Sequence, residues 1–125
     1  MKRLICTAVF LALLAPGLAP AQGDAASGKA LYESRCIACH SVEANRIGPR
    51  HAGVFGRKAG TVPGYDYSEA LAKSTIVWNE RTLDAWLENP ERLIPGQKMG
   101  YQLGDEAMRA DIIAYLRSVS RKPKN

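Results

Sequence analysis

The sequence is poor in the side chains from which metal clusters and disulfide frameworks are built. It has three cysteines and two histidines among 125 residues. A tetrahedral zinc site needs four ligands, and outside residues 36–40 the chain offers only Cys6 and His51. A thioredoxin-like dithiol needs alternating strands and helices, and the chain has no parallel-sheet pattern. The scarcity of ligands therefore disfavours a zinc site, and the absence of a parallel-sheet pattern disfavours a dithiol redox pair.

The sequence also lacks a strand pattern, an internal repeat and a basic stripe interleaved with aromatic residues. The last absence argues against nucleic acid as a partner. The formal net charge is +5, and it falls to about +3 if Lys2 and Arg3 are removed with the segment described next. The sequence thus predicts an all-α domain with a modest positive charge.

The only long apolar run lies at the amino terminus. Residues 1–3 include two cations, residues 4–14 are apolar, and residues 19–21 read Ala-Pro-Ala. The run is shorter than the ~20 residues that span a bilayer, and this order is typical of a secretory signal peptide. We predict that residues 1–21 are a signal peptide and residues 22–125 a single periplasmic domain without a membrane span. An uncleaved anchor is the alternative.

Residues 36–40 carry the strongest motif. They read Cys36-Ile37-Ala38-Cys39-His40, the C-x-x-C-H pattern by which a c-type haem is attached. Each sulfur can form a thioether with one haem vinyl group, and His40 can bind the iron as proximal ligand. The motif predicts one covalent haem c, held through Cys36 and Cys39. Such a cofactor would also supply the apolar core that a small mature chain otherwise finds hard to build.

Four helices are predicted from capping residues and apolar periodicity. They cover about Asp24–Arg35, Glu69–Lys73, Glu80–Glu88 and Asp105–Ser118. Between residues 43 and 64, five glycines and two prolines predict a long loop folded over the haem. Residues 93–99 contain Pro95-Gly96 and are predicted to be irregular.

A dedicated electron carrier usually fills both axial positions of its iron with protein ligands. The candidates for the sixth position are Met99, Met108 and His51. Met99 is favoured because an irregular loop can aim a side chain at a fixed point. Met108 lies on the apolar stripe of the last helix and is expected in the core. For His51 no role beyond packing or solvation is expected.

At this point the sequence resembles the class I cytochrome c family, from Gly28 to Leu116. The resemblance is carried by CIACH, Gly48-Pro49, Gly56-Arg57-Lys58-Ala59-Gly60, Gly64-Tyr65-Asp66-Tyr67-Ser68, Trp78, Leu87-Glu88-Asn89-Pro90, Pro95-Gly96-Gln97-Lys98-Met99 and residues 109–116. It implies the small class I fold, in which the terminal helices cross beside one haem.

The resemblance also implies roles for single residues. His40 and Met99 would be the axial ligands, and the Pro49 carbonyl would accept a hydrogen bond from the His40 ring. A buried haem propionate would be held by Arg57, Tyr67 and Trp78. Gly28 and Tyr32 would pack against the last helix near Ile112 and Tyr115.

Three positions depart from the family pattern. His51 stands where an apolar residue usually packs near the haem, so its ring must be either solvated or hydrogen-bonded. Gln97 stands where a threonine often contacts a propionate, and an amide can donate as well. Trp86 replaces a tyrosine of mitochondrial members, so the hydroxyl beside the methionine sulfur would be missing.

The sequence therefore predicts a monomeric one-electron carrier rather than an enzyme. Its partners would be redox proteins such as an oxidase, a quinol–cytochrome c reductase or a dehydrogenase. A peroxidase-like catalyst and a gas-binding sensor are the alternatives, and both need an open sixth position, against which Met99 argues.

Overall fold

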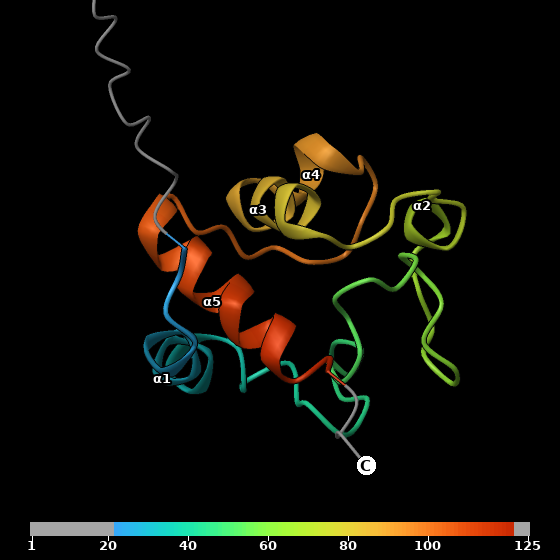
Figure 1. Ribbon diagram of the computed structural model, residues 1–125. Helices are drawn as coiled ribbons and strands as arrows, with labels where there is room; N and C mark the ends of the chain where they lie inside the picture. Colours follow the sequence, from blue (N-terminus) through green and yellow to red (C-terminus); the bar gives the residue numbers. More distant parts are fainter. Residues whose placement is uncertain (1–21, 122–125) are drawn as a thin grey trace, which may run out of the picture.

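Five helices surround the centre of the molecule in the computed structural model, which describes residues 22–121 (Figure 1). They are α1 (Ala25–Arg35), α2 (Glu69–Ala72), α3 (Glu80–Glu88), α4 (Pro90–Leu93) and α5 (Glu106–Ser118). Within that range no strand forms, and the only ladder contact is an isolated bridge between Lys58 and Val77. The all-α prediction is confirmed. The predicted signal peptide, residues 1–21, lies outside the described residues.

The helices begin where the capping residues predict. The Asp24 carboxylate accepts a hydrogen bond from the Ser27 amide at 2.7 Å, which caps α1. Asn79 caps α3 through a reciprocal capping box with Thr82. Asp105 caps α5. These side chains satisfy amides that have no partner within the helix, so the sequence predictions hold to within one residue.

The helix α4 was not predicted. Asn89 ends α3 and its side chain accepts from the Arg92 amide, so one residue closes the first helix and caps the second. Pro90 occupies the first turn of α4, where its fixed φ and missing N–H are tolerated. A second correction is that α2 ends at Ala72, one residue before the predicted end at Lys73.

The terminal helices α1 and α5 cross closely (Figure 1). A Cβ placed on Gly28 would lie 1.9 Å from the carbonyl oxygen of Asp111 and 3.0 Å from the Tyr115 Cβ. One turn later Tyr32 is 2% exposed, and its ring centroid lies 5.2 Å from that of Tyr115. The expected packing of Gly28 and Tyr32 on the last helix is confirmed, because only a residue without a side chain permits this approach.

We expect Gly28→Ala to destabilise the protein although alanine favours helix by about 1 kcal/mol. The new methyl group meets backbone rather than a movable side chain, and overpacking costs about 1–3 kcal/mol. Denaturant unfolding of the holoprotein measures the change. Gly104→Ala is the control, because nothing lies within 4 Å of its Cβ position. Equal stability of Gly28→Ala and the wild-type protein would show that moving the helices apart costs no more than the about 1 kcal/mol that alanine gains in a helix.

One ion pair, between a buried arginine and a partly exposed aspartate, ties α3 to α5. Arg109 is 6% exposed, and its Nε donates to the Asp84 carboxylate at 2.6 Å. The same guanidinium donates to the carbonyls of Leu103 and Gly104, each at 3.0 Å. It thereby holds the chain that leads from the central cavity into α5.

None of the helices between residues 22 and 121 has the length and apolar character that crossing a membrane requires.

Candidate functional site

A cavity of about 560 Å³ lies between the helices and the long loop. Its walls come from the end of α1, residues 36–57, residues 65–71, Trp78, α3, residues 97–101 and one face of α5. The lining includes the apolar side chains of Val54, Leu83, Leu87, Ile112 and Leu116. Mostly apolar cavities of this size, with a few polar groups that converge, are the usual form of a small-molecule or cofactor site.

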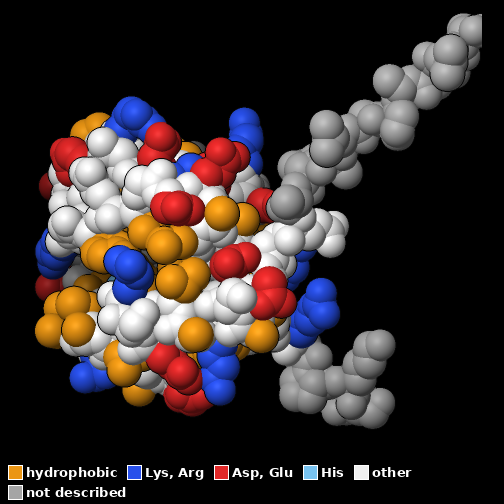
Figure 2. All heavy atoms as spheres, turned by 90° about the vertical axis from the view of Figure 1, so that its left-hand side faces the viewer, with side chains coloured by type: hydrophobic (Ala, Val, Ile, Leu, Met, Phe, Trp, Pro, Cys, Tyr) orange, Lys and Arg blue, Asp and Glu red, His pale blue; other side chains and the backbone are white. Residues whose placement is uncertain are grey.

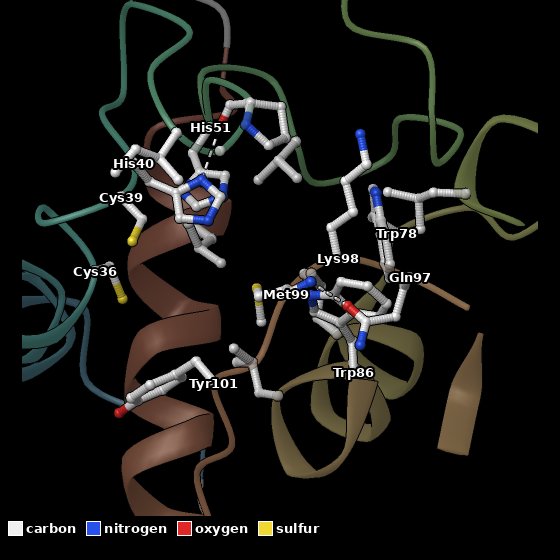
Figure 3. Close-up of a pocket in the computed structure, with 18 of the residues that line it drawn as sticks. Cys36, Cys39, His40, His51, Trp78, Trp86, Gln97, Lys98, Met99 and Tyr101 are labelled. Atoms are coloured by element: carbon white, nitrogen blue, oxygen red, sulfur yellow. Dashed lines mark hydrogen bonds between the residues drawn. The ribbon is translucent and has the colours of Figure 1, made fainter. Parts of the chain in front are cut away.

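The C-x-x-C-H stretch forms a tight turn directly after α1. The amides of Cys39 and His40 both donate to the carbonyl of Cys36, at 3.1 and 2.9 Å. The two sulfurs consequently lie on one side of the cavity (Figure 3). Burial raises the pKa of the Cys36 thiol to about 11, so it is neutral near pH 7. In the described part of the chain no three His, Cys, Asp or Glu side chains cluster as metal ligands.

His40 is held with a defined ring nitrogen facing the cavity (Figure 3). Its Nδ1 lies 2.8 Å from the carbonyl oxygen of Pro49. Burial lowers the pKa of His40, which favours the neutral ring. A carbonyl can only accept, so Nδ1 carries the proton and Nε2 keeps its lone pair. The ring also contacts Gly48, where a Cβ would lie 2.1 Å from the His40 Cε1.

Met99 reaches into the cavity from the other side, and its sulfur lies across the open space from His40 (Figure 3). The Met99 amide donates to the Gln97 side-chain oxygen. The Gln97 amide nitrogen donates to Glu91 at 3.3 Å. In this structure Gln97 therefore fixes the loop that presents the thioether. Met108 belongs to α5, packs against the core and does not line the cavity.

A third group of predicted residues, Arg57, Tyr67 and Trp78, lines one wall of the cavity. The Arg57 guanidinium donates to the carbonyls of Ala52 and Arg50, at 2.8 and 3.1 Å. Among residues 22–121 it makes no ion pair with a carboxylate, and burial lowers its pKa. A half-buried cation without an anionic partner, beside a hydroxyl and an indole, fits a carboxylate-bearing ligand.

Two further aromatic side chains complete the lining. Trp86 is 9% exposed, and its ring centroid lies 5.3 Å from that of Trp78. Tyr101 was not predicted as a site residue, and its buried hydroxyl has no hydrogen-bond partner. The sequence carries no signal for this placement, because residues 99–105 form no regular element whose periodicity would orient the ring.

His51 is more deeply involved than the sequence suggested. Its ring stacks on His40 with centroids 4.1 Å apart and planes at 20°. Its Nδ1 lies 2.9 Å from the Tyr32 hydroxyl. Burial, with His40 and Arg57 nearby, lowers the pKa of His51 well below its ordinary value. The sequence left two alternatives for this ring, solvation or hydrogen bonding, and in the structure the ring is hydrogen-bonded.

The cavity thus brings together two thiols on one side, an imidazole and a thioether across from each other, and a cation without an anionic partner. This donor set fits a flat apolar group with two sites of covalent attachment, a metal and acidic substituents. The fold and the site define a small helical protein of the c-type haem class. Comparison of the sequence then gives the family: the model described as "Cytochrome c" matches residues 25–120, and the chain belongs to the cytochrome c family.

Relatives and solved structures agree with this assignment. The chain is 47% identical over 106 residues to cytochrome c2 of Rhodopila globiformis, covering 82% of this chain and 99% of that protein. It is 46% identical over 100 residues to cytochrome c of Euglena viridis, covering 78% and 98%. Its fold matches cytochrome cH from Methylobacterium extorquens with a TM-score of 0.73 and 43% identity, covering 77% and 99%.

Membership of the family confirms two predictions. The fold is that of a class I cytochrome c. One haem c is bound covalently, through Cys36 and Cys39. The protein is accordingly a haem-based electron carrier that acts with redox partners.

Proposed function

We propose that residues 22–125 form a monomeric periplasmic electron carrier in which His40 and Met99 remain axial ligands in both oxidation states. The observation that carries the proposal is the arrangement of the His40 Nε2 and the Met99 sulfur on facing sides of one cavity (Figure 3). The haem supplies reversible one-electron chemistry at its iron. Residues 1–21 are proposed to be a signal peptide that is removed during export.

The side chains around the cavity would hold the cofactor still. Pro49 orients the His40 ring and increases its donor strength. Met99 is a soft ligand that favours the reduced state. Because His40 and the Met99 loop are each fixed by a hydrogen bond, these residues would hold the haem with little rearrangement on electron transfer.

The remaining polar side chains would control charge and water. Arg57, Tyr67 and Trp78 would bind a propionate in the wall where the guanidinium has no other anion. Trp86 would cover the methionine ligand and exclude water from it. The protein is not proposed to be an enzyme, since a filled sixth position leaves no site at which a substrate binds the iron.

Electrons would enter and leave where the cavity reaches the surface near Cys39. The Cys39 side chain is exposed there, and Ile47, which also lines the cavity, is 75% exposed. An exposed apolar surface of this kind suits brief docking to an oxidase, a quinol–cytochrome c reductase or a dehydrogenase. On the face seen in Figure 2, cationic and anionic side chains are interspersed. This mixture supports redox proteins as partners more than nucleic acid.

The experiment that tests the proposal is an absorbance spectrum of the purified holoprotein, oxidised and reduced, with and without carbon monoxide. We expect a low-spin spectrum, a weak ferric iron–sulfur charge-transfer band, and no change on addition of carbon monoxide. A high-spin spectrum, or ready carbon monoxide binding by the reduced protein, would mean that the sixth position is open. The peroxidase-like and gas-binding alternatives would then be preferred.

A further inference from the structure

On the His40 side of the cavity, two side chains that are not proposed to bind iron pack against the proposed ligand. His40, His51 and Tyr32 form a continuous column that runs from the cavity to the crossing of α1 and α5. The column contains a face-to-face stack, a hydrogen bond and a packed aromatic pair. We propose that His51 is a positioning residue for the His40 imidazole, anchored by Tyr32, and that it sets the ring orientation and thereby tunes the reduction potential. The inference rests on the proposed ligation of iron by His40.

The first step is geometric. The Pro49 carbonyl holds the His40 ring at Nδ1 alone, and a single hydrogen bond limits rotation of a ring less than a contact over its whole face. The His51 ring provides that contact, lying within 20° of parallel at a centroid distance of 4.1 Å. An aliphatic side chain at position 51 would fill the space but would supply neither a parallel face nor a hydrogen bond.

The second step is the anchor. The Tyr32 hydroxyl is 2.9 Å from the His51 Nδ1, and the two rings meet edge to face at 5.6 Å. Tyr32 is itself 2% exposed and packed against Tyr115 of α5. His51 is therefore tied to the close packing between α1 and α5, and through this anchor it can hold the ring on which it stacks.

The third step is electronic. An imidazole bound to ferric iron carries more positive charge than one bound to ferrous iron. The π face of a neutral aromatic ring attracts positive charge placed over it. Stacking of His51 on His40 should consequently stabilise the ferric state and lower the reduction potential relative to a protein with an aliphatic residue at that position.

The test uses the holoprotein and three variants, His51→Leu, His51→Phe and Tyr32→Phe, measured at one pH. Two quantities are recorded: the reduction potential, and the hyperfine-shifted NMR signals of the haem methyl groups, which report the orientation of the axial imidazole. For His51→Leu we expect a changed methyl pattern and a ferric/ferrous equilibrium shifted toward ferrous by about threefold to tenfold, tenfold being about 59 mV for one electron. His51→Phe keeps a ring for stacking and should restore part of the wild-type pattern.

A double-mutant cycle tests the anchor. If Tyr32 acts through His51, Tyr32→Phe alters the methyl pattern in the wild-type protein but not in the His51→Phe background. Wild-type potential and methyl signals in His51→Leu would overturn the proposal, whatever the change in unfolding free energy. A wild-type holoprotein that is high-spin or binds carbon monoxide would instead overturn the proposed function, so the two failures are distinguishable.

Discussion

Met99→Ala should convert the protein from one that excludes carbon monoxide into one that binds it. The methionine sulfur is the only thioether in the cavity wall formed by residues 22–121, and alanine cannot reach the centre. In the wild-type protein carbon monoxide can bind only to the minor population in which the sulfur has left the iron. If that population is about 1% or less, removing the sulfur raises the apparent affinity at least about a hundredfold. A carbon monoxide titration of the reduced holoprotein measures this change.

The same variant should have a lower reduction potential and should lose the ferric iron–sulfur charge-transfer band, because methionine ligation favours ferrous iron. Met108→Ala is the matched control. Met108 packs against the core from α5 and does not line the cavity, so this variant should lose stability without binding carbon monoxide. If Met99→Ala and the wild-type protein have equal carbon monoxide affinity, Met99 is not the sixth ligand.

Gly48→Ala should damage the proximal side although the added group is a single methyl. The new Cβ would lie 2.1 Å from the His40 Cε1 and 2.5 Å from its Nδ1. The ring cannot move aside cheaply, since its Nδ1 is bonded to Pro49 and its other nitrogen is proposed to bind iron. Overpacking of this kind costs about 1–3 kcal/mol. That cost is a factor of about five to 150 in favour of states in which His40 has left the iron.

The measurement is the low-spin fraction of the ferric holoprotein together with the amount of haem incorporated per chain. Both should fall in Gly48→Ala. Gly104→Ala adds the same methyl at a position with nothing within 4 Å and should match the wild-type protein in both. Full low-spin haem in Gly48→Ala would show that the backbone at residue 48 can retreat, and that this wall of the cavity does not hold the ligand in place.

Predictions from the sequence succeeded best where the deciding interaction is local. Asp24, Asn79 and Asp105 each bond to an amide three residues later, so the chemistry that starts the helix is contained within one turn. The C-x-x-C-H motif is also local, because its two cysteines and its histidine lie within five consecutive residues. The sequence did not predict α4 because Asn89 both ends α3 and caps α4. A single residue before a proline indicates the end of one helix and does not by itself indicate that another begins.

The candidate site was predictable to the extent that the family pattern names its residues. His40, Met99, Arg57, Tyr67 and Trp78 all line the same cavity. Their roles as ligands and propionate partners stay proposals. Tyr101 and His51 are different, because nothing in the neighbouring sequence tells whether a ring at such a position faces the solvent or the cavity.

By itself the sequence determined α1, α2, α3 and α5, the covalent attachment of haem and the residue types available as ligands. Each of these depends on groups a few residues apart, whose relative positions follow from covalent geometry. Only the tertiary structure decided that His51 stacks on His40 and bonds to Tyr32, 19 residues earlier. It also decided that Gly28 meets the backbone of Asp111. Such contacts arise when distant segments pack, and packing selects one arrangement among many that the local pattern allows.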